Sequence, residues 1–299
     1  MSQDTFSLDE LRAANKIELP AAENLVANDG VTLSYRRYLP QSPRAVVLFY
    51  HGGGAHNAAS YPHLGQGLKT QGIATYMPDL RGHGASGGTR GDAPSPKQVW
   101  ADVSSFIQHI RAELPNLPLF LGGHSSGSGL VLNYASQPNH LPVEHYLFLS
   151  PQFGFRSNTA RVPVLASFAK VNKLPFILNA MSGKMLAGHS QAVQFNYPAE
   201  LLATNPSLLT SYSVNMANAV TPAAPHQQFV QLDRPFGLWI GSDDEQIDAD
   251  KVLAFADLAS KVRAQSHIQR INGAKHLSIL LNSHDMIGAW IQRSVSSPA

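Results

Sequence analysis

The sequence predicts an α/β fold in which a mostly parallel central sheet carries helices on both faces and is interrupted by an inserted cap. Three observations lead to this prediction. Short, wholly apolar runs recur along the chain, as expected for strands that are covered on both faces. Segments with apolar residues at helical spacing separate these runs, which favours parallel βαβ units with right-handed crossovers. The alternation breaks once, between Leu149 and Phe236, over 86 residues (150–235) that are too many for a simple connection.

Turn and cap signals predict the first elements. The pattern Ser7-Leu8-Asp9-Glu10 is typical of a capping box and predicts a short helix at that point. Asp29-Gly30 separates two strand-like stretches, 23–28 and 31–39, and this dipeptide is the strongest short signal for a hairpin. Ser95, which is followed by a proline, predicts the start of a long helix.

Apolar patterning predicts the remaining elements of the sheet and its helices. Short apolar runs predict strands at 45–50, 73–78, 119–121, 146–149, 236–240 and 268–271. Apolar residues at helical spacing predict helices near 61–68, 99–110, 130–134, 252–262 and 287–291. Strands and helices therefore alternate over most of the chain.

The stretch that breaks the alternation is predicted to be a cap, or lid, above the carboxyl edge of the sheet. It divides the chain into a core of residues 1–151, a cap of residues 152–232 and a second part of the core, residues 233–299. Helix-like pieces separated by prolines lie at 164–172, 176–181 and 206–219.

The predicted cap is unevenly charged. Between residues 153 and 231 it holds five basic residues but a single acid, Glu200. Two interpretations stay open, namely a chance bias on a solvated surface and a basic rim around an apolar pocket roof. On the second interpretation, a bulky residue facing the site, with Phe168 and Phe176 as candidates, limits the length of a bound apolar chain.

Composition excludes several classes of function. The 299 residues include 22 Lys and Arg against 20 Asp and Glu, a formal charge of +2, and no basic run suited to a phosphate backbone. We therefore expect no nucleic-acid partner. The absence of cysteine excludes disulfides, thiolate catalysis and cysteine-based zinc sites. Because no signal peptide and no apolar run long enough for a transmembrane segment are visible, we expect a cytoplasmic protein.

A turn at Ser125 is the candidate centre of the chemistry. Gly123-His124-Ser125-Ser126-Gly127 lies between an apolar run and a helical stretch, the context of an elbow that exposes a nucleophilic serine. Glycines two residues to either side relieve crowding, and the following helix N-terminus favours developing negative charge. A register centred on Ser126 fails, because His124 and Ser128 would occupy the glycine positions. We identify Ser125 as the candidate nucleophile.

A nucleophilic serine needs a base within hydrogen-bond reach and an acid that orients this base. The chain has 13 histidines, so the candidate base has to be selected by its position relative to the predicted strands. Asp244 and His276 each follow one of the last two predicted strands, at the edge where open α/β sheets build their sites. We therefore predict His276 as the base and Asp244 as the acid. Asp243 and Asp248 are rivals, whose alternative role is to cap the next helix.

The third requirement is an oxyanion hole made of two backbone N–H groups. One is expected from Ser126, the residue after the nucleophile, and the other from the loop that follows the strand at 45–50. That loop reads His51-Gly52-Gly53-Gly54, and Gly53 is the predicted donor because glycine lets the backbone approach closely. The alternative is that these glycines form only a tight turn.

Together these stretches resemble the α/β-hydrolase superfamily. The matching stretches are residues 51–56, 78–86, 122–127, 241–244 and 273–276. Within the superfamily the chain is similar to the monoacylglycerol lipase and lysophospholipase branch, which is grouped with serine aminopeptidase-like hydrolases. The resemblance covers nearly the whole chain after residue 20.

The resemblance implies hydrolysis of a carboxylic ester through an acyl-serine intermediate, with no metal and no organic cofactor. The implied substrate is a small acyl ester, such as a monoacylglycerol or a lysophospholipid. Two other functions stay open. An aminopeptidase-type serine peptidase would share the same catalytic residues, and a non-catalytic module of this fold would bind a ligand without cleaving it.

Overall fold

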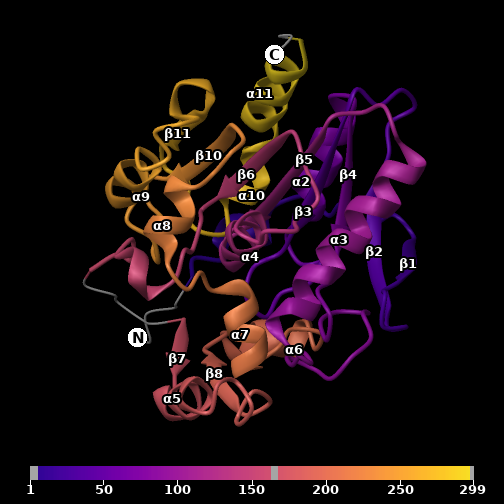
Figure 1. Ribbon diagram of the computed structural model, residues 1–299. Helices are drawn as coiled ribbons and strands as arrows, with labels where there is room; N and C mark the ends of the chain where they lie inside the picture. Colours follow the sequence, from indigo (N-terminus) through magenta and orange to yellow (C-terminus); the bar gives the residue numbers. More distant parts are fainter. Residues whose placement is uncertain (1–5, 163–167, 297–299) are drawn as a thin grey trace.

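The computed structural model describes residues 6–162 and 168–296, which contain a central eight-stranded sheet (Figure 1). Along the sheet the strands follow the order β1-β2-β4-β3-β5-β6-β10-β11. The pairings of β2 with β1 and with β4 are antiparallel. The other pairings between neighbouring strands are parallel. The α/β fold class with a mostly parallel sheet is therefore confirmed.

The strands lie close to the apolar runs that predict them. Their bounds are β1 (Ala22–Val26), β2 (Thr32–Tyr38), β3 (Ala45–Tyr50), β4 (Ile73–Pro78), β5 (Leu119–His124), β6 (His145–Leu149), β10 (Phe236–Gly241) and β11 (His267–Ile271). All residues of β3 are buried, which explains why this run shows no alternation of polar and apolar residues. Val46 and Leu48 face one core of the protein and Val47 and Phe49 face the other.

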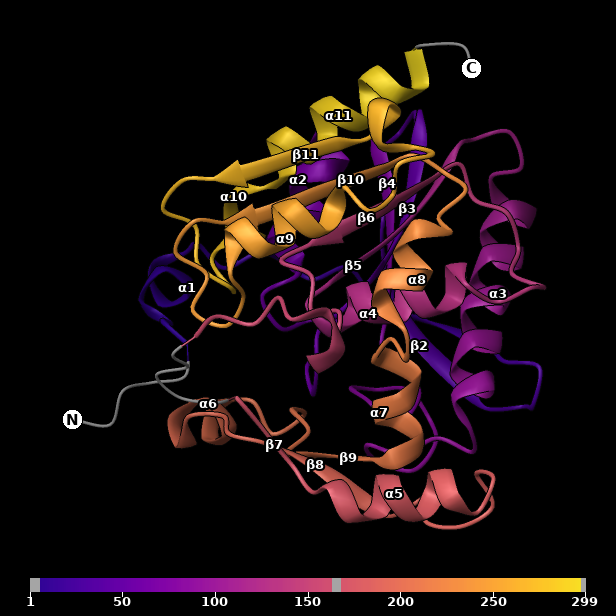
Figure 2. The ribbon, with the colours of Figure 1, turned by 60° about the vertical axis from the view of Figure 1, so that its left-hand side comes forward.

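Helices cover both faces of the sheet (Figures 1 and 2). One face packs against α3 (Pro96–Glu113), α4 (Ser126–Ala135), α8 (Pro225–Val230) and α9 (Ala249–Ala256). The other packs against α2 (Pro62–Thr70), α10 (Ile279–Asn282) and α11 (His284–Ser296). Within residues 6–162 and 168–296, no helix combines the length and the apolar character that crossing a membrane requires.

Local signals at the start of the chain are partly confirmed. β1 and β2 form the predicted hairpin, and Gly30 in its turn has a φ of +85°, which glycine tolerates best. Ser95 caps α3, because its hydroxyl accepts a hydrogen bond from the Gln98 N–H at 3.2 Å.

The predicted helix at 252–262 is too long, since α9 ends at Ala256 and turns follow it.

The predicted short helix is present as α1 (Asp9–Ala13), but the predicted capping box is wrong. The helix begins after Leu8, which makes no side-chain cap. Ser7 instead donates its N–H to Glu245 and accepts a hydrogen bond from Lys275 on its hydroxyl. Contacts with residues far away in the sequence therefore replace the local cap.

Residues 152–232 are called the cap segment below. The middle part of this segment lies at one end of the molecule, whereas its last helix, α8, packs against the central sheet (Figure 2). The cap segment holds η1 (Phe155–Ser157), β7 (Ala169–Val171), α5 (Lys173–Met181), β8 (Gln191–Phe195), α6 (Ala199–Thr204), β9 (Ser211–Ser213), α7 (Val214–Val220) and α8. The strands β7, β8 and β9 form an antiparallel sheet of three strands among the described residues.

The helices predicted in this stretch are only partly present. Residues 176–181 lie in α5, as predicted. Residues 206–219 instead hold β9 followed by most of α7, and the described end of 164–172 contains β7. The rest of that piece, up to residue 167, lies outside the described residues. Strands this short depend on their pairing partners, which local patterning does not show.

A buried ion pair joins the loop after β4 to α3. Arg81, 2% exposed, donates to both carboxylate oxygens of Asp102, from Nε at 2.9 Å and from Nη2 at 2.7 Å. Replacing Arg81 by methionine should lower the free energy of unfolding by about 3–5 kcal/mol, because it leaves the Asp102 charge buried without its partner. Urea unfolding measures this.

The control for this prediction is Arg263→Met, which breaks the exposed ion pair with Asp257. Exposed pairs contribute little, so the control should change the free energy of unfolding by less than about 1 kcal/mol. Equal losses in the two variants would show that burial of the Arg81 pair does not matter.

Candidate active site

Ser125 lies at a sharp turn between β5 and α4. Its backbone has a φ of +53° and a ψ of −122°, a conformation that residues with a side chain rarely adopt. The chain can make this turn because Gly123 and Gly127, two residues to either side, lack side chains. A Cβ added to Gly123 would lie 2.3 Å from the Gly127 carbonyl carbon, and one added to Gly127 would lie 2.4 Å from the Tyr50 oxygen. Both glycines are therefore required by close backbone approach.

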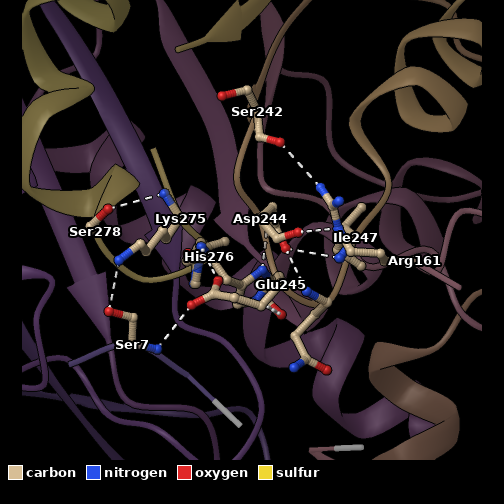
Figure 3. Close-up of polar contacts among 12 residues, drawn as sticks. Ser7, Arg161, Ser242, Asp244, Glu245, Ile247, Lys275, His276 and Ser278 are labelled. Carbon is tan, nitrogen blue, oxygen red and sulfur yellow. Dashed lines mark hydrogen bonds and ion pairs between the residues drawn. The ribbon is translucent and has the colours of Figure 1, made fainter. Parts of the chain in front are cut away.

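The Ser125 hydroxyl is the first member of a chain of three side chains. Its Oγ lies 3.0 Å from His276 Nε2, and His276 Nδ1 lies 2.8 Å from Asp244 Oδ2. Asp244 follows β10 and His276 follows β11, and the parallel pairing of these strands brings both loops to the same sheet edge (Figure 3). The structure thus brings together the three side chains that the sequence singles out.

The buried Asp244 carboxylate is held in its charged form. Its Oδ1 accepts hydrogen bonds from the N–H groups of Gln246 at 3.0 Å and Ile247 at 2.8 Å. Burial alone would raise the pKa of Asp244, but the attraction to His276 and these hydrogen bonds outweigh it, so the pKa is lowered. A carboxylate can only accept, so His276 Nδ1 carries the proton and Nε2 is left to accept from Ser125.

The same attraction acts on the imidazole in the opposite sense. Burial would lower the pKa of His276, but the charge and the hydrogen bond of Asp244 raise it above its ordinary value. A higher pKa makes His276 a stronger base toward the Ser125 hydroxyl.

The two rival carboxylates occupy other positions. The Asp243 side chain is exposed and accepts a hydrogen bond from Ser242 Oγ at 2.8 Å. Asp248 caps α9 by accepting from the Lys251 N–H at 3.2 Å. Among the described residues, neither carboxylate is hydrogen-bonded to His276, and no group of three or more His, Cys, Asp or Glu could hold a metal ion.

The glycine loop after β3 lies against the elbow. A Cβ added to Gly52 would lie 3.1 Å from Ser125 Cβ, and one added to Gly53 would lie 3.4 Å from Ser126 Oγ. Within residues 6–162 and 168–296, neither the Gly53 N–H nor the Ser126 N–H donates to a backbone oxygen. Ser126 is the first residue of α4, where N–H groups lack acceptors inside the helix. Both N–H groups are thus available to a developing oxyanion.

A buried relay of hydrogen bonds connects this loop to the histidine loop. The Gly52 N–H donates to the Tyr61 hydroxyl at 2.7 Å, and this hydroxyl lies 3.0 Å from His124 Nδ1. His124 Nε2 lies 2.9 Å from the His276 carbonyl oxygen, so Nε2 is the protonated nitrogen. Burial lowers the pKa of His124 to about 3, which keeps the ring neutral, as the relay requires.

Two tyrosines of the cap segment hold the glycine loop from its other side. The Gly54 N–H donates to the Tyr212 hydroxyl at 2.8 Å, and the Tyr197 hydroxyl donates to the Gly53 carbonyl at 2.7 Å. The His83 ring is neutral because burial keeps its pKa well below the ordinary value, and its Nδ1 donates to a backbone carbonyl at 2.9 Å. His83 Nε2 therefore accepts from the Tyr212 hydroxyl at 2.6 Å. The cap segment therefore helps to shape the glycine loop.

Aromatic rings extend from the histidine into the cap segment. Phe6 stacks on the His276 ring with centroids 5.5 Å apart and contacts Phe168 at 4.7 Å. Phe168 stacks on Phe195 at 5.1 Å, and the Phe195 ring lies against the glycine loop. Of the two predicted pocket residues, Phe168 belongs to this cluster of rings. Phe176 packs against the main hydrophobic core.

Sequence reasoning misses several residues that hold the loops of the site. Tyr61 is recognised only as part of a helix, and Tyr197 and Tyr212 belong to no motif. Arg161 counts only toward the basic bias of the cap segment, although it donates to the Asp244 carbonyl at 2.6 Å. Glu245 could have been found as a further carboxylate beside the predicted acid.

Known proteins resemble this chain in sequence and in structure. The human monoglyceride lipase is 27% identical over 89% of this chain and 86% of its own length. An uncharacterized abhydrolase domain-containing protein of Dictyostelium discoideum is 36% identical over 41% of this chain, which is 13% of that longer protein. A crystal structure of a soluble variant of the monoglyceride lipase of Saccharomyces cerevisiae superimposes with a TM-score of 0.74. That alignment, at 19% identity, covers 94% of this chain and 98% of the other.

The family described as "Serine aminopeptidase, S33" matches residues 41–281, which include β3, the elbow and both loops that carry Asp244 and His276. The match covers most of the chain and agrees with the sheet topology and with the monoglyceride lipase relatives. The chain therefore belongs to the serine aminopeptidase S33 family of hydrolases and has the α/β-hydrolase fold.

Proposed function

We propose that the protein is a serine hydrolase that cleaves a carboxylic ester through an acyl-serine intermediate. Ser125 is the nucleophile, His276 the base and Asp244 the acid that orients it. One observation carries the proposal, namely the continuous chain of contacts at 3.0 Å and 2.8 Å that links these side chains beside the Gly53 and Ser126 N–H groups.

The geometry supports a two-step reaction. His276 Nε2 takes the Ser125 proton as Oγ attacks the ester carbonyl, and the Gly53 and Ser126 N–H groups bind the oxyanion. The imidazolium returns the proton to the leaving alcohol, and Asp244 stabilises the cation meanwhile. Water then attacks the acyl-serine with His276 again as the base, which releases the carboxylic acid and restores Ser125.

The proposed substrate is a small ester with an apolar acyl chain, of the monoacylglycerol or lysophospholipid kind. The rings of Phe6, Phe168 and Phe195 provide apolar surface beside the site. The cap segment also exposes large apolar side chains around α5, which lies at the outer end of the molecule (Figure 2). These are Val171, Leu174, Ile177, Leu178, Met181, Met185 and Leu186. Such a surface suits a substrate that leaves a lipid aggregate, and relatives in this family are named monoglyceride lipases.

The family description also raises an aminopeptidase as the second candidate. Such an enzyme needs a carboxylate to bind the free amine of its substrate. Glu200, the single acid between residues 153 and 231, forms an ion pair with Arg12 at 2.9 Å. Glu245 near the site accepts hydrogen bonds from two backbone N–H groups. This distribution of carboxylates favours a neutral ester.

A fluorophosphonate probe separates the proposed enzyme from a non-catalytic module. Ser125 should react covalently with the probe, and mass spectrometry of the digested protein should place the adduct on this residue. An unmodified Ser125 under conditions that label a reference serine esterase would overturn the proposed function.

Acyl-chain length should control the rate. Each additional methylene buried in the cap segment contributes about 0.8 kcal/mol, so kcat/KM should rise about fourfold per carbon until the pocket is full. Phe168→Ala should move the optimum to longer chains, because it removes a ring beside the site. Initial rates on p-nitrophenyl esters of increasing length, with monoacylglycerols and aminoacyl amides, measure both effects.

The matched control is Phe176→Ala. It removes a ring that packs against the main hydrophobic core, so the optimum chain length should not change. An equal change of optimum in both variants would contradict the role of Phe168. Faster cleavage of aminoacyl amides than of neutral esters would favour the aminopeptidase.

A further inference from the structure

The glutamate directly after Asp244 binds the main chain of the catalytic histidine. One oxygen of the half-buried Glu245 carboxylate accepts a hydrogen bond from the His276 N–H at 2.9 Å. The other accepts one from the Ser7 N–H, also at 2.9 Å (Figure 3). We propose that Glu245 is a positioning residue that fixes the histidine loop and places a second negative charge beside the imidazole. This inference rests on the function proposed above.

Two neighbouring carboxylates thus hold one histidine at two points. Asp244 binds the ring at Nδ1, at 2.8 Å, and Glu245 binds the main chain of the same residue. Asp244 thereby fixes the rotation of the His276 ring, and Glu245 fixes the position of the His276 main chain. Both carboxylates lie in the loop after β10. The distance of 3.0 Å between Nε2 and Ser125 Oγ depends on both restraints.

The segment of residues 6–10 lies next to the contact between Glu245 and the His276 N–H. Lys275 Nζ donates to Ser7 Oγ at 2.9 Å (Figure 3). The same Nζ lies 3.6 Å from a Glu10 carboxylate oxygen. Phe6, 3% exposed, covers the His276 ring. The segment therefore shields the hydrogen bonds of Glu245 partly from water, and a partly buried carboxylate interacts more strongly with its neighbours than an exposed one.

The other charged groups around His276 do not duplicate Glu245. The Lys275 ammonium group is turned toward Ser7 and Glu10. The Arg161 guanidinium group binds main-chain carbonyls in the acid loop. The His124 ring, whose centroid lies 5.0 Å from that of His276, is neutral because burial depresses its pKa. Asp244 and Glu245 are thus the negative groups that act on the imidazole among the described residues.

The sign of the effect of Glu245 follows from its charge. Burial lowers the pKa of His276, but the attraction of Asp244 and, after it, of Glu245 raises it. Without the charge at position 245 the pKa of His276 should fall. Ser125 reacts only when His276 is neutral, so the acidic limb of its reactivity should move to lower pH. The rate on the plateau should fall about tenfold, because the base is weaker and its loop has lost a charged hydrogen bond.

The test measures the rate at which a fluorophosphonate labels Ser125 from about pH 5 to about pH 9. Glu245→Gln keeps the shape of the side chain and removes its charge. It should show the acidic limb at lower pH than the unsubstituted protein and a plateau about tenfold lower. Asp243→Asn is the matched control, because it removes the same charge from the exposed carboxylate on the other side of Asp244. Its limb should stay in place.

A second variant separates the charge from the hydrogen bond. Glu245→Asp keeps the charge but is one methylene too short to reach the His276 N–H. It should label more slowly than the unsubstituted protein, with its acidic limb unchanged. If Glu245→Gln does not fold, this variant carries the test, and a rate equal to that of the unsubstituted protein would overturn the proposal.

The outcomes distinguish this inference from the proposed function. An acidic limb in folded Glu245→Gln at the same pH as in the unsubstituted protein would overturn the proposal and leave the proposed function intact, whether or not the rate is lower, because the charge of Glu245 would then not act on His276. If Ser125 is not labelled even in the unsubstituted protein, the proposed function fails, and the role of Glu245 fails with it.

Discussion

Replacing Ser125 by alanine should reduce kcat for ester hydrolysis by about 10⁶, because the reaction loses its nucleophile and cannot form the acyl-enzyme. The residual rate would come from the oxyanion loop and from substrate binding alone. Steady-state rates with a chromogenic ester measure the loss in kcat, and rapid-mixing traces with the ester in excess over the enzyme show the missing burst of alcohol release.

Ser126→Ala is the control at the next position. Ser126 contributes its backbone N–H, which alanine keeps, so its variant should lose no more than about tenfold. If Ser126→Ala lost more activity than Ser125→Ala, the elbow would be assigned one residue too early. The backbone of Ser125, with a φ of +53°, makes such a shift in register unexpected.

Asp244→Asn should reduce kcat by about 10⁴ in a protein that remains folded. The Asp244 oxygen that faces Gln246 and Ile247 accepts two backbone N–H groups, so an asparagine would place its own oxygen there. Its NH₂ group would then point at His276 Nδ1, which would have to accept. The proton would move to Nε2, where it blocks the transfer from Ser125.

Asp243→Asn and Asp248→Asn provide the comparison for this prediction. Each should cost about tenfold or less, because one carboxylate is exposed and the other caps α9. Steady-state kinetics with circular dichroism of each variant measures activity and folding together. A greater loss in either neighbour than in Asp244→Asn would transfer the role of the acid to that residue.

The sheet and the elbow could be predicted because their signals are local. The run at 45–50 is apolar at each position and becomes a strand buried on both faces. The glycines around Ser125 are dictated by steric contacts within a few residues of the turn. Both features depend only on residues close to them in the sequence, so they can be recognised from the sequence alone.

The parts that prediction missed depend on contacts between distant residues. Ser7 has the sequence of a helix cap, but Glu245, 238 positions away, takes its N–H. The strand β9 is stabilised by its pairing with β8. Tyr212 on β9 binds the glycine loop through its hydroxyl, although Tyr212 belongs to no recognisable sequence motif. Tertiary contacts outweigh local preference at both places.

Residues 6–13 join parts of the protein that the sequence keeps far apart. Phe6 lies on the His276 ring, and Arg12 is bonded to Glu200 of the cap segment at 2.9 Å. A tag or a surface linker attached at Phe6 itself would therefore lie beside the imidazole ring. Helix α11 ends on a side of the molecule remote from the cap segment (Figure 2). Immobilisation at the end of α11 should accordingly leave the rate of catalysis unchanged, whereas attachment at Phe6 should lower it.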